Sequence, residues 1–174
     1  CRTPTRRVPR PRTAAGRAIV FSAVDTRTQL PIVGMVGGGQ LARMTQQAAI
    51  ALGQSLAVLA ESPDDSAALV CRDVSVGAPN DLAALRAFAA HCDVLTFDHE
   101  HVPGEMLRTL QSEGVAVYPS PDALIYAQDK AHMRRRLAEL GIPVPAFEVC
   151  AAGEMPGRIT TFAEKNGWPV VVKV

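Results

Sequence analysis

The sequence predicts an α/β protein with a parallel sheet, followed by the start of a second domain. Short apolar runs rich in β-branched residues alternate with amphipathic segments between Pro31 and position 120. Three consecutive glycines, Gly37 to Gly39, separate the first apolar run from the first amphipathic segment. After Pro121 this alternation stops. Strands that alternate with helices form a parallel sheet covered on both faces, so we predict a Rossmann-like domain over 31–120.

The composition is that of an ordinary globular protein. The 174 residues are 48% hydrophobic and 20% charged, with a net charge of +1, which suits one domain and part of another. A net charge this small does not favour nucleic acid as a partner, and no apolar run approaches the roughly 18 residues of a membrane span. The four cysteines lack metal-ligand spacing. They favour reduced thiols in a cytoplasmic protein over a disulfide framework, and we predict no metal site.

Residues 1–30 differ from the rest. The first 17 residues hold six arginines, three prolines and no acid, so they cannot bury enough apolar surface to fold alone. We predict that 1–30 is a disordered, dispensable basic leader. A flexible tail or a mis-assigned upstream extension explains it better than a transit peptide or a nucleic-acid-binding arm.

The alternation predicts five strands in the first domain. The helices between them include one over 40–52 that ends at Gly53, a short one opening at Pro63, one capped by Asn80 or Asp81, and one from Pro103 to Gly114. The predicted strands are 32–37, 55–59, 74–76, 93–97 and 115–118.

The glycine run is the first candidate site. Gly37-x-Gly39-x-x-Ala42 matches the loose dinucleotide fingerprint, in which glycines allow a sharp turn and the amides of the following helix face an anion. A turn without a ligand explains the same residues equally well.

Ligands on parallel sheets bind beyond the carboxyl ends of the strands. Glu61 ends the second strand, where dehydrogenases place the acid that binds the NAD ribose, although a solvated carboxylate explains it better. Two acids and two histidines follow the fourth strand, at positions 98–101. They form either a polar cluster in a ligand cleft or a surface loop, and no third ligand at suitable spacing supports a metal.

The second part, 121–174, is predicted to hold helices over 122–126, 129–140 and 160–166 and strands over 146–149 and 168–174. Lys173 lies within the apolar run of the last strand, where its ammonium needs water, an acid or a phosphate. Lys130 opens a helix, where the dipole disfavours a cation. Because the chain stops within the last apolar run, we expect it to be a fragment of a longer protein.

Taken together, the motifs resemble those of N5-carboxyaminoimidazole ribonucleotide synthetases, purine-biosynthesis enzymes with the ATP-grasp fold. The resemblance covers 31–174. It rests on VGMVGGGQLARM, ESPDDSAA, DVLTFDHEHVP, YPSPDAL, AQDKAHMRRRLAELGIPVP and WPVVVKV, in that order.

The resemblance implies a pre-ATP-grasp domain over 31–120 and a truncated ATP-grasp domain over 121–174. It implies that the parent enzyme uses ATP and Mg²⁺ to carboxylate aminoimidazole ribonucleotide with bicarbonate, in the cytoplasm and as a homodimer. Many members carry arginine at the position of Lys130, which would bind a phosphate through two parallel hydrogen bonds. The implied substrate-binding residues are Gly38, Gly39, Gln40, Leu41 and Glu100, and the implied ATP-binding residues are Lys130 and Lys173.

In this family the glycine-rich ATP loop and the magnesium-binding acids would follow Val174, so the fragment is expected to be inactive by itself, and no catalytic residue is assigned. Two other interpretations stay open. One is an NAD-dependent dehydrogenase domain, supported by the fingerprint and Glu61. The other is a non-catalytic ATP-grasp-like remnant that binds a nucleotide or a protein partner.

Overall fold

The computed structural model describes residues 25–173. The predicted disorder of residues 1–24 lies outside this range. The chain divides into two compact units, with the division between Pro121 and Asp122. Across residues 25–173, no helix combines the length and the apolar character needed to cross a membrane.

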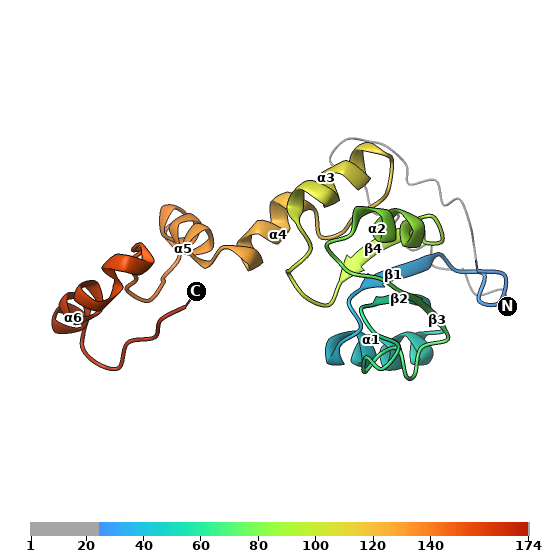
Figure 1. Cartoon of the computed structure of the whole chain (residues 1–174), viewed down its shortest axis with the longest axis horizontal. Coiled ribbons are helices and arrows are strands. Elements are labelled where there is room, and N and C mark those ends of the chain that lie inside the picture. The colour runs from blue at the N-terminus through green and yellow to red at the C-terminus, as the bar shows by residue number, and fades with distance from the viewer. Residues whose placement is uncertain (1–24, 174) are drawn as a thin grey trace, which may run out of the picture. The chain divides into compact units, whose positions relative to one another are not determined.

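The first unit is built on a four-stranded parallel sheet in the order β3-β2-β1-β4 (Figure 1). Helix α1 lies on one face of this sheet, and α2 and α3 lie on the other (Figure 1). The strands are β1 (Ile32–Val36), β2 (Ser55–Ala60), β3 (Asp73–Val76) and β4 (Val94–Phe97). The helices are α1 (Gln40–Leu52), α2 (Leu82–Ala89) and α3 (Gly104–Ser112). This confirms the predicted α/β class.

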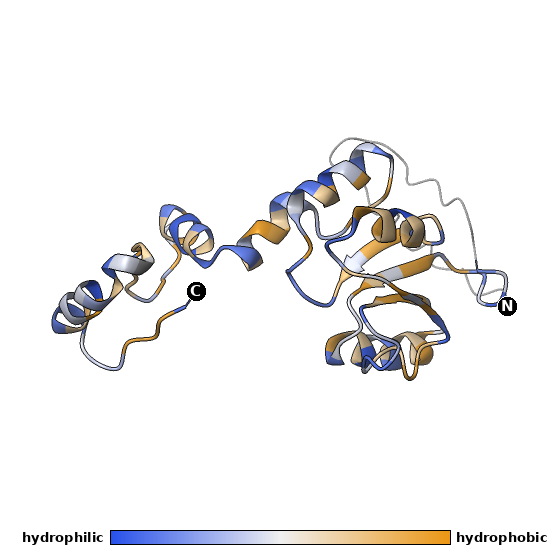
Figure 2. Cartoon of the chain, viewed as in Figure 1, coloured by the Kyte–Doolittle hydropathy of each residue, from blue (hydrophilic) through white to orange (hydrophobic). Residues whose placement is uncertain are grey.

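Both faces of the sheet are packed, as a parallel sheet requires. All six residues of β2 are buried, and β1 and β2 are largely apolar (Figure 2). The edge strand β3 differs, since Asp73 and Val76 are exposed. The cluster on the α1 side comprises Met35, Ala42, Ala49, Leu56, Val58, Ala60 and Ala67. The residues buried to 2% exposure or less among α2, β4 and α3 include Leu85, Phe88, Leu95, Leu107 and Leu110.

The helix ends follow the sequence signals. Asp81 caps α2, because its carboxylate accepts the Ala83 N–H at 2.8 Å. Gly53 ends α1 in the left-handed conformation, with φ of 68°. The short helix predicted from Pro63 is instead a series of turns. Asp65 shapes this loop by accepting the N–H groups of Glu61 and Ser62, which draws the backbone away from a regular helix.

The predicted fifth strand is wrong as a strand, although its segment lies beside β4. Leu95 and Val117 form an isolated parallel bridge. The Leu95 N–H donates to Ala116 O at 2.8 Å, and the Tyr118 N–H donates to Leu95 O at 2.9 Å. Pro119 follows at once, and its ring fixes φ at about −65°, away from the roughly −120° of a parallel strand, so the pairing does not extend beyond one bridge.

The second unit holds helices but no strand within its described residues. Its helices are α4 (Pro121–Gln128), α5 (Lys130–Glu139), the short η1 (Ala152–Glu154) and α6 (Met155–Asn166). The strands predicted over 146–149 and 168–174 are therefore wrong within the described residues. A strand needs a neighbouring backbone to pair with, and no described segment pairs with either run.

The predicted disordered leader includes residues 25–30, and for them the prediction is wrong. Asp25 is 6% exposed, and its carboxylate accepts a hydrogen bond from Ser55 Oγ at 2.8 Å. A polar segment can order without apolar periodicity when its charged groups are paired against the folded domain.

We predict that Leu95→Ala lowers the free energy of unfolding by about 2–5 kcal/mol, because it leaves a cavity beneath the sheet. Leu95 is fully buried. Leu52→Ala is the matched control, since Leu52 is 79% exposed and its truncation should stay within about 0.5 kcal/mol. Urea unfolding followed by circular dichroism measures both. Equal losses in the two variants would contradict the observed packing.

Candidate functional site at the carboxyl edge of the sheet

Three loops meet at the carboxyl edge of the sheet. The register pairs Val36 of β1 with Leu59 of β2 and with Phe97 of β4, so the three strands end at the same level. The loops that follow are the glycine turn at 37–39, the β2–β3 connection from Glu61, and the loop from Asp98 to His101. This is the edge at which ligands bind on parallel sheets.

The glycine turn is shaped by close contacts from the other two loops. Gly37 has φ of 113°, a conformation that other residues rarely adopt. A Cβ on Gly37 would lie 1.6 Å from Asp98 Oδ1, and one on Gly38 would lie 2.7 Å from Asp65 Oδ2. The glycines are therefore needed because two aspartates approach the backbone from neighbouring strand ends.

Asp98 is the central polar group of this edge. Its side chain is 4% exposed, and its Oδ2 accepts the Gly39 N–H at 2.9 Å. Its Oδ1 is buried and has no hydrogen-bond partner among the described residues, and the His99 Nε2 lies 3.7 Å away. A buried carboxylate oxygen of this kind needs a hydrogen-bond donor.

This geometry weighs against the dehydrogenase interpretation. In a dinucleotide-binding turn the amides at the start of the helix face the pyrophosphate. Here the carboxylate of Asp98 already faces the Gly39 amide. A pyrophosphate at the same place would meet a buried negative charge, so the turn suits a ligand group that donates hydrogen bonds.

The β2–β3 connection is tied to the glycine turn. The Ala67 N–H donates to Gly38 O at 2.8 Å, and Ser66 Oγ donates to Gln40 Oε1 at 3.0 Å. Glu61, the candidate for ribose binding in a dehydrogenase, is exposed at the start of this connection. The connection therefore holds the turn and the Gln40 side chain in place.

The implied substrate-binding residues lie in the glycine turn, at the start of α1 and in the loop after β4. Gly38 and Gly39 form the turn, and Gln40 and Leu41 open α1 beside it, with Leu41 60% exposed. Glu100 is half-buried in the loop after β4. Asp98, the other acid of the predicted cluster at 98–101, contacts the turn.

The histidines of the same loop contact each other. The rings of His99 and His101 are 5.1 Å apart, and the His101 N–H donates to His99 Nδ1 at 3.1 Å. No group of three metal-ligating side chains occurs within residues 25–173.

Cys71 and Cys92 do not offer a reactive thiolate. Cys71, Cys92 and Cys150 are free. Burial raises the pKa of Cys92 to about 12, and burial also raises the pKa of Cys71. Thiols that stay protonated at neutral pH are poor nucleophiles.

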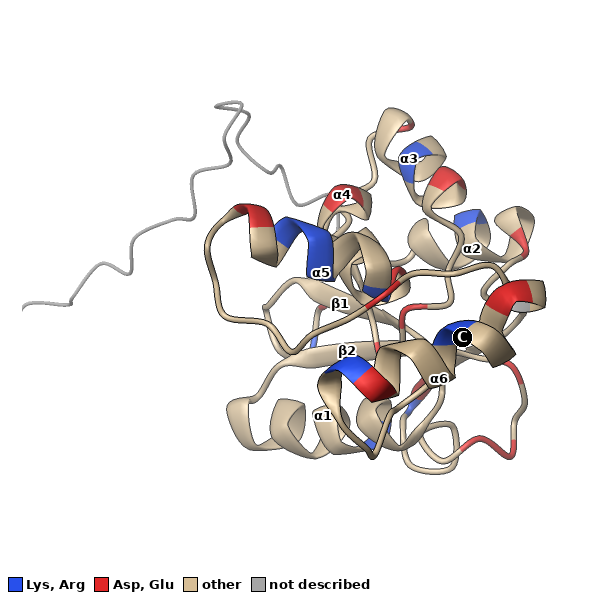
Figure 3. Ribbon diagram, turned by 90° about the vertical axis from the view of Figure 1, so that its left-hand side faces the viewer, with Lys and Arg blue, Asp and Glu red and all other residues tan. Residues whose placement is uncertain are grey.

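The second unit has a basic pocket of its own, of about 640 Å³. Lys130 and Lys173 both line it, together with Arg134 on α5 and Arg158 on α6. Figure 3 shows the basic residues along α5. Arg158 donates to Glu148 at 2.6 Å, and Asp129 caps α5 by accepting the His132 N–H at 2.8 Å. Glu148 also lines the pocket, so four cationic side chains face one carboxylate there, and this excess of positive charge is of the kind that binds phosphate groups.

Comparison with known proteins identifies the family. The profile described as "Ribonucleotide synthetase preATP-grasp domain" matches residues 30–128. The chain belongs to this family.

Two curated relatives match most of the present chain but only about a third of their own length. The N5-carboxyaminoimidazole ribonucleotide synthase of Mycobacterium tuberculosis is 58% identical over 143 residues, which cover 82% of this chain and 33% of the relative. The Corynebacterium ammoniagenes synthase is 52% identical over 118 residues, which cover 68% and 29%. The chain therefore spans about a third of the length of these relatives.

Solved structures of such enzymes share the fold. The synthetase of Thermus thermophilus superposes with a TM-score of 0.65 at 34% identity, covering 79% of this chain and 37% of that one. The Aspergillus clavatus synthase in complex with ADP and 5-aminoimidazole ribonucleotide superposes with a TM-score of 0.66 at 32% identity. This match covers 80% of the present chain and 37% of the Aspergillus chain. These matches confirm the resemblance drawn from the motifs.

We predict that Gly37→Ala is strongly destabilising and that shortening Asp98 recovers part of the loss. The new methyl group would collide with Asp98 Oδ1, so Gly37→Ala with Asp98→Ala should lose less stability than the sum of the two single variants. The strain of the positive φ remains in both backgrounds, so recovery should be partial. A double-mutant cycle by urea unfolding measures the coupling, and strictly additive losses would show that the two groups do not meet.

Proposed function

We propose that this chain forms the amino-terminal part of an N5-carboxyaminoimidazole ribonucleotide synthase. The parent enzyme would carboxylate 5-aminoimidazole ribonucleotide with bicarbonate, at the expense of ATP, in purine biosynthesis. The observation that carries this proposal is the family match over 30–128, together with 58% identity to the Mycobacterium tuberculosis enzyme.

We assign the ribonucleotide to the carboxyl edge of the sheet. Gly38, Gly39, Gln40 and Leu41 would line its site, and Glu100 would face it from the loop after β4. Asp98 supports this assignment chemically, because its buried Oδ1 suits a hydroxyl or amino group of the ligand.

ATP is assigned to the second unit. Lys130 and Lys173 would contact its phosphates or the adenine side, and both line the basic pocket of that unit. When bound, ATP supplies the phosphoryl group that activates bicarbonate. The two lysines would hold the polyphosphate and offset negative charge that develops during transfer.

Mg²⁺ is proposed for the parent enzyme, with ligands beyond residue 174. The described residues do not fit such a site, since no group of three suitable side chains occurs among them. We further propose a cytoplasmic homodimer for the parent, with ATP, bicarbonate and the ribonucleotide as its partners and no nucleic acid or membrane among them.

A chimeric enzyme tests the proposal. Residues 31–174 would replace the matching segment of the Mycobacterium tuberculosis synthase. We expect the chimera to form ADP only when both the ribonucleotide and bicarbonate are present, because the two segments are 58% identical.

The 174-residue chain alone is the comparison, and we expect no ribonucleotide-dependent phosphate release from it. An inactive but folded chimera would favour the non-catalytic remnant. A rise in the melting temperature of the chain with NAD would favour the dehydrogenase instead.

Lys173→Ala in the chimera should weaken ATP affinity and turnover together, by about 10-fold or more, because a charge-assisted contact contributes roughly 1.5–3 kcal/mol. Lys173→Arg should recover only part, since a planar guanidinium does not reproduce a compact ammonium. Lys165→Ala is the control, because Lys165 is exposed on α6 and lies outside the basic pocket. Steady-state kinetics at varied ATP measure both effects. If kcat and the KM for ATP of Lys173→Ala stay within twofold of those of the parent chimera, Lys173 is not part of the ATP site.

A further inference from the structure

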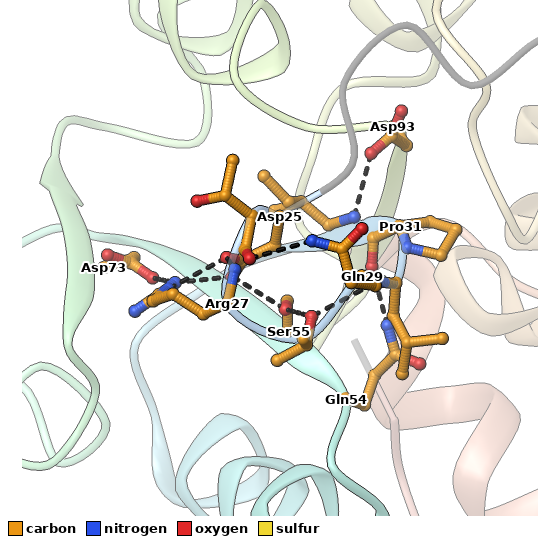
Figure 4. Close-up of polar contacts among 12 residues, drawn as sticks. Asp25, Arg27, Gln29, Pro31, Gln54, Ser55, Asp73 and Asp93 are labelled. Atoms are coloured by element: carbon orange, nitrogen blue, oxygen red, sulfur yellow. Dashed lines mark hydrogen bonds and ion pairs between the residues drawn. The ribbon is translucent and has the colours of Figure 1, made fainter.

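The edge of the sheet opposite the glycine turn carries a second polar network, which the proposed function does not use. Strand β2 begins at Ser55 and β3 begins at Asp73. Asp25 and Arg27, from the segment that precedes β1, reach both of these residues (Figure 4). The network thus joins the segment 25–30 to the amino-terminal ends of two strands.

Asp25 is the anchor of this network. Its side chain is 5% exposed. Its Oδ1 accepts two hydrogen bonds from Arg27, one from Nε and one from the backbone N–H, both at 2.9 Å. Its Oδ2 accepts a hydrogen bond from Arg27 Nη2 at 2.6 Å and another from Ser55 Oγ at 2.8 Å. A buried carboxylate is tolerated when its oxygens are paired in this way. The Arg27 hydrogen bonds, with that of Ser55, hold the pKa of Asp25 well below its usual range, so it stays charged at neutral pH.

Arg27 extends the network to the edge of the sheet. Its Nη2 also donates to Asp73 Oδ2 at 2.7 Å, while both side chains remain nearly half exposed. Asp73 is the first residue of β3, which is the outermost strand and pairs only with β2, over four residues. The segment before β1 therefore reaches across the start of β2 to the strand with the least support.

The backbone of 25–30 closes on itself, which fixes these side chains. The Asp25 N–H donates to Leu30 O at 3.1 Å, and the Gln29 N–H donates to Asp25 O at 2.8 Å. Gln29 adopts a positive φ of 58° to complete the turn. The hydroxyl of Thr28 hydrogen-bonds that of Ser55. A closed loop presents Arg27 at small additional cost in conformational entropy.

We propose that residues 25–30 are a strap that pins the edge strand β3 through the Asp25–Arg27–Asp73 bridge and thereby steadies the glycine turn. The path to the turn is short. The connection that leads into β3 donates the Ala67 N–H to Gly38 O, so loosening the start of β3 frees one end of that connection. The strap acts on the fold and does not depend on which ligand the turn binds.

Hydrogen–deuterium exchange on the 174-residue chain tests the strap. Asp73→Ala removes only the hydrogen bond between Arg27 and Asp73, at the start of β3. We expect exchange of the β3 amides to rise about two- to fivefold, the range that a half-exposed ion pair supports. Amides of β4 and α2 should exchange as in the parent chain.

Arg27→Ala removes the side-chain hydrogen bonds to both Asp25 and Asp73, and it leaves the buried Asp25 carboxylate without its charge partner. We expect β3 and the connection around Ala67 to exchange roughly tenfold faster or more, because hydrogen bonds to a charged group are lost together. Arg86→Ala is the matched control: Arg86 pairs with Glu113 at 2.5 Å in the same unit, away from the strap.

Two results would overturn the proposal. One is unchanged β3 exchange in Asp73→Ala, which would make the bridge incidental to the edge strand. The other is a rise of the same size in β3, β4 and α2, which would mark general destabilisation. Should Arg27→Ala fail to fold, Asp73→Ala still decides between these outcomes, since it leaves the Asp25–Arg27 pair intact.

Discussion

The close approach of the Asp98 carboxylate to the glycine turn is the constraint on which the candidate site depends. Strand register places the end of β4 beside the end of β1. Asp98 then reaches the Gly39 amide and fills the space that a side chain on Gly37 would need. Glycine at position 37 is thus required by a neighbouring strand as well as by its own backbone conformation. The same contact places a carboxylate where a dinucleotide-binding turn would hold the pyrophosphate. This distinguishes the turn from a dinucleotide-binding one.

Asp25 and Asp98 are buried aspartates at opposite ends of the sheet, and they differ in how they are paired. Asp25, at the amino-terminal edge, has both oxygens hydrogen-bonded by Arg27 and Ser55. Asp98, at the carboxyl edge, has one oxygen bonded to a backbone amide and one without a partner among the described residues. Complete pairing is typical of a structural role, whereas an incompletely paired buried group is typical of a ligand site.

The two proposed ligands fall in different units of the chain. The ribonucleotide is assigned to the carboxyl edge of the sheet in the first unit, and ATP to the basic pocket of the second. In that second unit, the segments 146–149 and 169–173 both contribute to the lining of the pocket. Their apolar residues Val149, Val171 and Val172 are exposed, as β-rich sequence is when it lacks a pairing partner.

The sequence by itself determined the α/β class, the four strands near their observed bounds, a helix cap at Asn80 or Asp81, the Gly53 terminus and the family. These features depend on local periodicity, on capping chemistry or on linear motifs, all of which can be read along one chain. Tertiary structure alone decided that the fifth strand is a single bridge, that Asp98 contacts the glycine turn, and that residues 25–30 join the folded domain. Each of these depends on strand register or on a charge pair between residues far apart in sequence, such as Arg27 and Asp73, and neither leaves a periodic pattern in the chain.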